Sequence, residues 1–395
     1  MKISLYVPAW PPGQSANGIV TYAATLVPAL RRLGHDVYIL TSYFLDSAPD
    51  EYTIDLRSID IQPSIFARLI GRLSPERFIY DQFTTRLTIA LSQLKKEKDI
   101  DIFEIEDSFG WGLRLAEKNI VPVAIRLHGP WFLNGRFGHN AGTMRTRIAR
   151  EGQALAVASL VTSPSAAVLS EVQYFYATPL KHARVIPNPI NISPDSARWT
   201  LGLSDTRRIL FVGRFDRRKG GDLIISAFIN LAQLYPDLRL TFVGPDDGIV
   251  DSRNGSRVLF NEHPIPSAVR ARIDFLGQQS SSQIANLRTK HLFTIVASQF
   301  EILPYSVLEA MSYGSPIIAS KVGGIPELIR HEENGLLFES GNVSALVSAC
   351  RRLIEDNALA AKLGARARVD CAGTYNPLLV AEQTIAAYQT VFHSS

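Results

Sequence analysis

The sequence predicts an α/β protein with two domains of parallel β-sheet, and three observations support this prediction. The chain has 395 residues, which exceeds the size at which a single hydrophobic core keeps growing. Short apolar runs typical of buried strands alternate with helical stretches in two successive series. Between the two series, Pro187, Pro189 and Pro194 interrupt the pattern and indicate a linker.

The first series opens with a βαβ unit. A strand is expected at Ile3 to Val7, a turn-rich stretch at Pro8 to Gly18, a helix to about Leu33, and a second strand at Val37 to Leu40. The loop of such a unit opens at the carboxyl edge of the sheet, where doubly wound folds bind ligands. Four more strands are expected before the domain closes near Asn191: Ile100 to Ile105, Val121 to Leu127, Leu160 to Ser163, and Val185-Ile186.

The second series predicts another α/β domain. Its expected strands are Ile209 to Val212, Leu240 to Val243, Ile273 to Leu276, Leu292 to Ala297, Ile317 to Ala319 and Leu336 to Phe338. After a turn at Gly373 to Asn376, an apolar-striped helix is expected at Pro377 to Phe392. The expected domains are therefore residues 1–190 and 191–374 with a cleft between them, followed by a terminal helix at 375–395.

Composition narrows the class of protein. With 46% hydrophobic and 20% charged residues the chain reads as an ordered soluble protein, and no apolar run approaches the roughly 20 residues that span a bilayer. Met1-Lys2 leads straight into a strand without a leader segment, so a cytoplasmic location is expected. The net charge of +4, with bases and acids interleaved, argues against nucleic acid and suits anionic substrates.

Two cysteines occur, Cys350 and Cys371, and two are too few for a disulfide framework or a closed metal site. Both are expected to be small buried residues. No Asp-x-Asp arrangement or clustered set of histidines predicts a bound metal, and no cofactor is expected. No Gly-x-Gly-x-x-Gly follows a strand either, which argues against a dinucleotide-dependent oxidoreductase.

The segment Ser298 to Ile329 carries two carboxylates, Glu301 and Glu309, around an expected helix start. Glu301 follows the apolar run His291 to Ala297, which places it at the carboxyl end of a strand. Pro304 is expected in the first helical turn, where a missing amide hydrogen costs nothing. The amides of Leu303, Tyr305 and Ser306 would lie at the positive end of this helix, an arrangement that attracts phosphate.

This segment resembles the signature of the retaining nucleotide-sugar glycosyltransferases of family GT4, which have the two-domain GT-B fold. The matching landmarks are Glu301, Glu309-Ala310-Met311, Gly314, Pro316, Gly323-Gly324 and Pro326-Glu327. The resemblance implies that Glu301 faces the hydroxyls of the donor hexose, that Glu309 binds the ribose hydroxyls, and that the terminal helix crosses back onto the first domain. The usual Gly-Phe-Gly is replaced by the stiffer Ile302-Leu303-Pro304-Tyr305, so the accepted sugar stays open.

A basic loop follows the first strand of the second domain. Arg214 and Lys219 leave its opposite ends, and two cations there would hold a diphosphate whose charge rises as the sugar departs. The family's Gly-Arg-x4-Lys-Gly pattern matches from Gly213 onward, although an ordinary solvated loop is the plainer interpretation of such charges. Arg217 and Arg218 fall outside the pattern and are taken as surface charges.

Two further glycines are assigned to the donor by the same resemblance. Gly244 follows a strand and is expected to let the nucleotide approach the backbone, with the base near Leu276-Gly277. Gly18 stands where similar enzymes carry a Gly-Gly pair that touches the donor phosphate. Asn17 replaces the other glycine, and because Asn tolerates a positive φ, the turn is expected to survive.

His128 ends an expected strand of the first domain and is followed by Gly129-Pro130. A satisfied structural histidine is the common alternative, but the family has a histidine here that contacts the transferred sugar, so a donor-positioning role is favoured. The loop Trp131 to Gly142 and the acidic pair Glu106-Asp107 are expected to line the acceptor side, or to be an ordinary surface loop.

The segment 57–86 predicts an amphipathic basic helix. Ile65, Phe66, Leu69, Ile70 and Leu73 recur at helical spacing among Arg68, Arg72 and Arg77. Such a helix can lie on an anionic bilayer, which would suit a lipid-linked acceptor. Packing of the segment on its own domain is the alternative.

The residues and the family resemblance together predict a hexosyltransferase that uses a UDP-sugar or GDP-sugar and needs no metal. The resemblance alone implies that the enzyme retains the configuration of the sugar. The expected acceptor is a saccharide or lipid-linked saccharide, in polysaccharide or glycolipid synthesis. A sugar-nucleotide epimerase of similar fold and a non-catalytic nucleotide-sugar sensor remain the alternatives. Donor base, sugar, acceptor, linkage and oligomeric state stay open.

Overall fold

The computed structural model describes residues 1–12, 17–44, 46, 49–64, 71–135, 141–180, 182–250 and 257–392. The chain forms two compact units. Unit 1 consists of Met1–Pro189 together with Pro377–Ser395, and unit 2 consists of Ile190–Asn376. The division points lie within two residues of the boundaries expected from the sequence. Each unit is described by itself.

Unit 1 is built on a seven-stranded, fully parallel sheet in the order β3-β2-β1-β4-β5-β6-β7. The strands are β1 (Lys2–Trp10), β2 (Asp36–Phe44), β3 (Thr53–Asp55), β4 (Ile102–Glu106), β5 (Val123–Arg126), β6 (Leu160–Ser163) and β7 (Ala183–Val185). The inner strands are buried along their whole length, because helices of a parallel sheet cover both of its faces. The strand order reverses between β1 and β4. The carboxyl ends of strands at such a reversal are where open α/β sheets commonly bind ligands.

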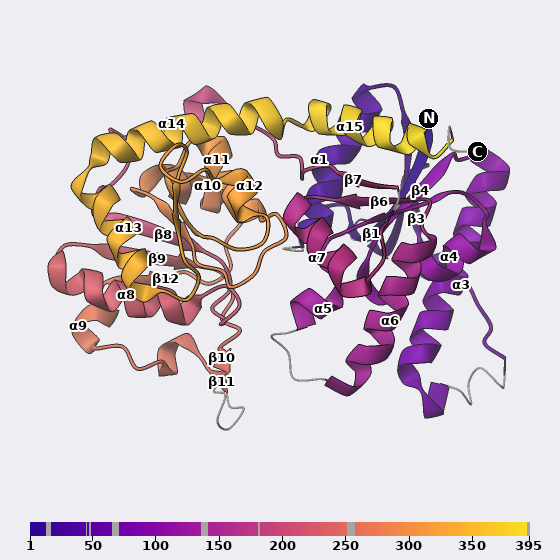
Figure 1. The fold of residues 1–395 in the computed structure, drawn as a ribbon, viewed down its shortest axis with the longest axis horizontal. Helices are drawn as coiled ribbons and strands as arrows, with labels where there is room; N and C mark the ends of the chain where they lie inside the picture. The colour runs from indigo at the N-terminus through magenta and orange to yellow at the C-terminus, as the bar shows by residue number, and fades with distance from the viewer. Residues whose placement is uncertain are drawn as a thin grey trace. The chain divides into compact units, whose positions relative to one another are not determined.

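The helices of unit 1 are α1 (Gly18–Arg32), α3 (Pro75–Lys98), α4 (Gly112–Lys118), α5 (Trp131–Asn134), α6 (Ala141–Val157), α7 (Ala166–Tyr176) and α15 (Pro377–Thr390). Helix α15 comes from the far end of the sequence and packs against α1 (Figure 1). The terminal segment is therefore an integral part of the first unit.

A buried polar cluster ties α15 to the sheet. Both carboxylate oxygens of Glu104, on β4, accept tyrosine hydroxyls: Oε1 from Tyr22 at 3.0 Å and Oε2 from Tyr388 at 2.8 Å. Burial raises the pKa of Glu104, and the nearby charge of Arg126 opposes this rise. Arg126 in turn donates to Asn188 Oδ1 at 2.9 Å, at the end of unit 1. One cluster thus fixes α1, α15 and the segment that leaves unit 1.

Unit 2 contains a six-stranded parallel sheet in the order β12-β9-β8-β13-β14-β15. The strands are β8 (Arg208–Val212), β9 (Arg239–Val243), β12 (Ile273–Phe275), β13 (Thr294–Val296), β14 (Ile317–Ser320) and β15 (Leu336–Phe338), with a separate hairpin of β10 (Ile249–Val250) and β11 (Arg257–Val258). The helices are α8 (Gly221–Leu234), α9 (Ser267–Arg270), α10 (Ser281–Lys290), α11 (Tyr305–Tyr313), α12 (Ile325–Leu328), α13 (Val343–Glu355) and α14 (Asn357–Thr374). The strand order reverses between β8 and β13.

Every strand expected from an apolar run is present, with ends shifted by a few residues. Strand β3 was not predicted, because its three residues carry no distinct apolar run. Helix α14 continues to Thr374, so the turn before α15 is shorter than expected. Cys350 and Cys371 are both free and buried, as predicted.

The prediction of one helix over residues 57–86 is wrong. A short 3-10 turn covers Leu56–Ser58 and residues 61–64 have no regular structure, whereas residues 71–73 are helical and α3 begins at Pro75. Proline at the first helical position starts a helix, so the segment is divided there. Ile65, Phe66, Arg68, Leu69 and Ile70 lie outside the described residues.

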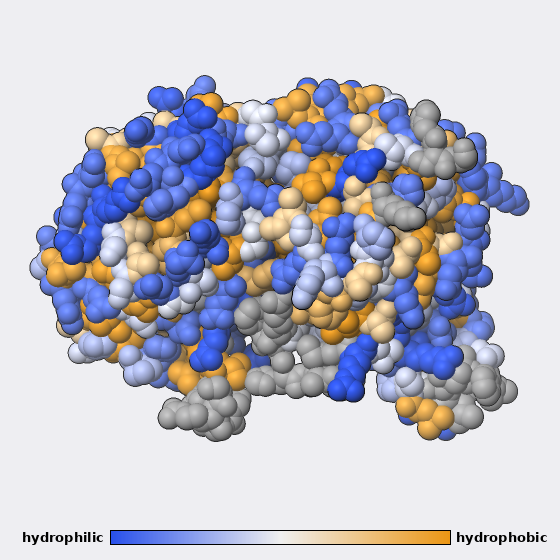
Figure 2. Space-filling view, in the orientation of Figure 1, coloured by the Kyte–Doolittle hydropathy of each residue, from blue (hydrophilic) through white to orange (hydrophobic). Residues whose placement is uncertain are grey.

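The surface of each unit is mixed in character. On the face drawn in Figure 2, hydrophilic and hydrophobic residues are interspersed over both units. Among the residues that the structure describes, no helix combines the length and apolar character needed to cross a bilayer.

Candidate active site

The reversal point of the second sheet brings two sequence-predicted residues together. The loop after β8 carries Lys219, and the segment after β13 carries Glu301; Lys219 Nζ lies 2.5 Å from Glu301 Oε1. The backbones of the two segments are also joined, because Gln299 N donates to Arg218 O at 2.8 Å. This position, outside the carboxyl ends of neighbouring strands where the order reverses, is where open α/β sheets bind ligands.

Glu301 is a buried carboxylate held in its charged form, with 6% of the residue exposed. Burial tends to raise the pKa of Glu301, but the charges of Lys219 and Arg218 and the hydrogen bonds from Lys219 and Ser298 outweigh it and lower the pKa. Ser298 Oγ donates to Oε1 at 2.6 Å, the same oxygen that Lys219 contacts. Within the described part of the chain, Oε2 is therefore left to accept a hydrogen bond from a ligand.

Arg214 lies on the same loop as Lys219 but has different partners. Its guanidinium contacts Asp247 Oδ2 at 3.1 Å and Asp216 Oδ2 at 3.4 Å, and the side chain is largely exposed. Asp216 also accepts from Lys219 N at 2.6 Å, so it shapes the loop between the two cations. Arg214 is thus free to exchange an exposed ion pair, worth little in water, for a bound anion.

Gly213 and Gly244 lie where the loops after β8 and β9 touch. Gly244 has φ of +143°, and a Cβ built on it would stand 2.0 Å from Gly213 O. The structure therefore requires glycine at position 244 for the packing of the two loops. Its expected approach to the nucleotide stays a prediction.

The start of α11 follows Glu301 closely. Pro304 has extended backbone angles and caps the helix, which begins at Tyr305, so the expected place of Pro304 inside the first turn is wrong by one residue. The side chain of Leu303 is buried in the core of unit 2. This packing fixes the backbone at Leu303, whose amide is a predicted phosphate ligand together with those of Tyr305 and Ser306.

Glu309 lies on α11 and pairs with a residue that the sequence did not reveal. Arg288 Nη2, on α10, donates to Glu309 Oε2 at 2.8 Å. The side chain of Glu309 is 37% exposed, whereas that of Arg288 is 1% exposed. The predicted ribose ligand is therefore anchored from the protein interior and open on its other side.

In unit 1, Gly18 is the first residue of α1, next to the reversal point of the first sheet. Asn17 does not use its tolerance of a positive φ: its φ is −125°, and its side chain accepts from Ile19 N at 2.9 Å. Asn17 caps the helix, a position that asparagine favours because its carbonyl oxygen satisfies an unpaired amide. The contact of Gly18 with a donor phosphate stays a prediction.

His128 follows β5, and its surroundings keep it neutral. Burial, and then the charge of Arg126, hold the pKa of His128 well below its ordinary value. The edge of its ring meets Tyr22, with centroids 5.2 Å apart, and its backbone amide donates to Asp107 Oδ1 at 2.9 Å. A neutral imidazole suits hydrogen bonding to a sugar hydroxyl better than charge stabilisation.

The acidic residues at the end of β4, Glu106 and Asp107, hold the loops around them. Asp107 accepts the backbone amides of His128 and Gly129, and Glu106 accepts that of Ser108. Burial raises the pKa of both carboxyls. Their expected role at the acceptor is untested, but their carboxylates hold the backbone that would line such a site.

The segment Trp131 to Gly142 is not a plain loop. Its start forms α5, its end belongs to α6, and residues 136–140 lie outside the described part. Arg147 lies over the rings of Phe109 and Trp131, at 3.7 and 4.0 Å from their centroids. The fully buried Glu151 accepts from Arg147 Nε at 2.8 Å, so this loop is anchored to α6.

Sequence reasoning missed Arg288, Ser298, Asp216, Asp247 and the part played by Arg218. Arg218 was taken as a surface charge, yet its charge helps to lower the pKa of Glu301. Arg217, by contrast, is exposed and pairs with Asp222 at 3.7 Å. Among the residues described, no cluster of three or more His, Cys, Asp or Glu is arranged to hold a metal ion.

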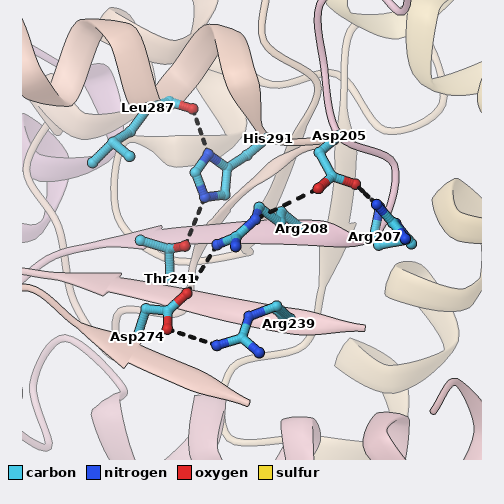
Figure 3. A network of polar contacts seen from close by, with 8 residues as sticks. All are labelled: Asp205, Arg207, Arg208, Arg239, Thr241, Asp274, Leu287 and His291. Carbon is cyan, nitrogen blue, oxygen red and sulfur yellow. Dashed lines mark hydrogen bonds and ion pairs between the residues drawn. The ribbon is translucent and has the colours of Figure 1, made fainter. Parts of the chain in front are cut away.

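A second polar network lies at the opposite edge of the same sheet (Figure 3). Asp274 bridges Arg208 at 2.9 Å and Arg239 at 2.8 Å, and these arginines start β8 and β9. His291 contacts Leu287 O and Thr241 Oγ1, each at 2.7 Å, and burial lowers its pKa. The network joins the amino ends of strands, so it supports the sheet and is separate from the candidate site.

Comparison with known proteins identifies the family of the chain. Residues 195–370 match the family model described as "Glycosyl transferases group 1", and residues 16–194 match the one described as "Glycosyltransferase Family 4". The two matches follow each other along the chain and together cover residues 16–370. The chain belongs to the GT4 family of glycosyltransferases.

Similar proteins span the whole chain. A glycogen synthase from Mycobacterium tuberculosis is 23% identical over 406 residues, covering 94% of this chain and 91% of the relative. The solved structure of sucrose-phosphate synthase from Thermosynechococcus elongatus has a TM-score of 0.76 at 23% identity and covers 100% of both chains. Anabaena HepE in complex with UDP-glucose has a TM-score of 0.69 at 19% identity and covers 99% of this chain and 100% of its own. These structures show the GT-B fold.

Proposed function

We propose that this glycosyltransferase is a retaining enzyme that transfers a hexosyl group from a nucleoside diphosphate sugar to a hydroxyl of a saccharide or lipid-linked saccharide. A role in polysaccharide or glycolipid synthesis follows from such an acceptor, and the M. tuberculosis relative, a glycogen synthase, supports it. The observation that carries the proposal is the 2.5 Å contact of Lys219 with Glu301 at the reversal point of the second sheet. UDP and GDP are the expected nucleotides, and the HepE complex with UDP-glucose favours UDP for the first trial.

The proposed roles of Lys219, Arg214 and Glu301 follow from which of their atoms already form hydrogen bonds within the protein. The ammonium of Lys219 has three hydrogens and gives one to Glu301, so two remain for the diphosphate. Arg214 would leave Asp216 and Asp247 for the same diphosphate. The unoccupied Oε2 of Glu301 would accept a hydroxyl of the donor hexose.

The proposed reaction needs charge stabilisation above all. The bond between the sugar C1 and the diphosphate oxygen breaks, and the acceptor oxygen bonds to C1 on the same face. The proton of the acceptor hydroxyl passes to an oxygen of the departing diphosphate. Negative charge grows on the diphosphate during this step, and preorganised cations and amides stabilise it without reorganisation. Neutral His128 would orient the donor hexose.

Ligand screening tests the proposal first. Thermal shifts with UDP-, GDP- and ADP-sugars should reveal one class that raises the melting temperature, because a ligand that binds only the folded state stabilises it. Nucleotide release that depends on an added saccharide acceptor would then separate a transferase from an epimerase or a sensor. Absence of stabilisation by every nucleotide sugar would contradict the proposal.

Three variants test the assignment of roles. Lys219→Ala and Glu309→Gln should weaken nucleotide binding, whereas Glu301→Ala should depress transfer more than binding. Glu309→Gln is preferred to Glu309→Ala, since removal of the whole side chain would leave the buried Arg288 without its partner. Unchanged binding and transfer in all three variants would remove the assignment.

A lipid-linked acceptor is supported by exposed apolar residues near the start of α3. Leu73 is 82% exposed and Ile79 60% exposed, and the side chain of Arg77 between them is exposed as well. An apolar and basic surface of this kind binds anionic bilayers. Sedimentation with phosphatidylglycerol vesicles should fall when both apolar residues are replaced by serine and should stay unchanged in the control Leu203→Ser, whose exposed side chain belongs to unit 2.

A further inference from the structure

The guanidinium of Arg288 has an unusual environment. The side chain is 1% exposed, and one of its nitrogens, Nη2, donates to Glu309 at 2.8 Å. Its other two nitrogens, Nε and Nη1, are buried and have no hydrogen-bond partner among the residues that the structure describes. Glu309 is therefore the carboxylate that balances this buried cation.

Such an arrangement is costly unless the partner stays in place. A buried charge loses its hydration, and one well-placed counter-ion recovers only part of that loss. The carboxylate of Glu309 is accordingly held by a strong and directional bond, because the guanidinium is planar, always charged and rigid. Tyr313, one turn further along α11, lies close enough that the charges of Glu309 and Arg288 act on its pKa in opposite directions.

The pair is asymmetric. Arg288 is enclosed between α10 and the core, while 37% of the Glu309 side chain is exposed. The bond uses Oε2, so Oε1 is the oxygen that has no partner among the described residues. A glutamate on an open helix surface samples several rotamers, and the buried arginine selects one of them.

We propose that Arg288 is a positioning residue which fixes the rotamer of Glu309 and thereby sets the preference for ribonucleotides. The inference rests on the proposed function, in which Glu309 meets the ribose hydroxyls. Arg288 itself does not touch the nucleotide. It acts by holding Glu309 Oε1 where the two hydroxyls arrive.

The test compares UDP with 2′,3′-dideoxy-UDP by isothermal calorimetry on the full chain. A hydrogen bond to a charged group is worth about 10- to 100-fold in affinity, so the native protein should prefer UDP by about that factor. In Arg288→Met this preference should fall to within about threefold of unity, and Arg288→Lys, which restores the cation, should recover part of it. The control Lys290→Met removes an exposed cation from the end of the same helix and should leave the preference unchanged.

Other outcomes distinguish a failure of this inference from a failure of the proposed function. If Arg288→Met weakens both nucleotides equally and keeps their ratio, Arg288 is only structural and the inference is wrong. If the native protein binds UDP and its dideoxy analogue equally, Glu309 is no ribose ligand and the inference fails while nucleotide binding stands. If neither UDP nor GDP binds at all, the proposed function itself fails.

A double-mutant cycle gives a second measurement that does not depend on the fold of Arg288→Met. In a Glu309→Gln background, Arg288→Lys should cause no further change in the UDP preference, because the two residues act through one contact. Additive losses of preference would show that Arg288 acts on the nucleotide independently of Glu309 and would overturn the inference.

Discussion

Replacement of Lys219 by methionine should destabilise unit 2, because it leaves Glu301 charged and buried. Methionine is unbranched and one atom shorter than lysine, so it keeps most of the side chain and removes its charge and hydrogen bonds. Breaking a buried ion pair by removing one partner costs about 3–5 kcal/mol. Glu301 keeps its hydrogen bond from Ser298 and the nearby charge of Arg218, so the lower limit, about 3 kcal/mol, is expected.

This cost should appear as a shift in melting temperature. For a unit of the size of unit 2, 1 kcal/mol corresponds to about 2–4 °C, so the variant should melt about 6–12 °C lower at neutral pH. Differential scanning calorimetry of the full chain measures this shift. The double variant Lys219→Met/Glu301→Gln should recover most of the loss, because no uncompensated carboxylate remains.

The shift should also depend on pH. In the native protein the pKa of Glu301 is lowered, so its contribution to stability is present above the pKa of the unfolded chain and is lost as the pH falls through the folded value. In Lys219→Met the effect of burial dominates, and the pKa of Glu301 in the folded protein should rise above its value in the unfolded chain. The variant should therefore lose stability as the pH rises and Glu301 ionises. The gap between the two proteins should therefore be wider at pH 7.5 than at pH 5. A gap that is constant with pH, or a double variant as unstable as the single one, would refute this reasoning.

Two further predictions concern packing. Gly323 has φ of +49°, and a Cβ there would stand 1.7 Å from Glu301 O. Gly323→Ala should therefore lower the melting temperature and cut transfer at least tenfold. Gly341 has φ of +80° and open space around it, so Gly341→Ala should cost only the strain of the left-handed backbone, about 1–2 kcal/mol. Equal effects of the two would contradict the argument from Glu301. Tyr388→Phe should destabilise unit 1 by about 1–3 kcal/mol, because one oxygen of the buried Glu104 loses its donor. An unchanged calorimetric transition would show that the contact contributes nothing.

The strands were predictable because a parallel sheet covered on both faces demands short apolar runs, and such runs are visible in the sequence. The loop that carries Lys219 and the segment that carries Glu301 were expected at strand ends, and their contact follows from the strand order, in which β8 and β13 are neighbours although far apart in the chain. No local pattern in the sequence predicts the order of the strands. The proximity of the two residues was therefore an implication of the family resemblance.

The partners of the predicted residues were not predictable. Arg288 lies on a helix whose spacing shows no distinct apolar stripe, and its contact with Glu309 depends on how α10 and α11 pack. The sequence argument for Asn17 used the tolerance of asparagine for a positive φ. In the structure the side chain of Asn17 accepts a hydrogen bond from the amide of Ile19, and the backbone of Asn17 is extended. In both cases the observed contact is a side-chain hydrogen bond. The residue type shows that such a bond is possible but does not show which partner it will have.

The discontinuity of unit 1 has a consequence for how the chain is made. Glu104 is synthesised before unit 2, but one of its two hydroxyl partners, Tyr388, belongs to α15 and leaves the ribosome only after unit 2. Until unit 2 has been translated, unit 1 therefore lacks α15, and Glu104 and the side of α1 that contacts α15 stay uncovered. Expression of residues 1–189 alone would reproduce this state, and a separately added α15 peptide is the natural means of completing it.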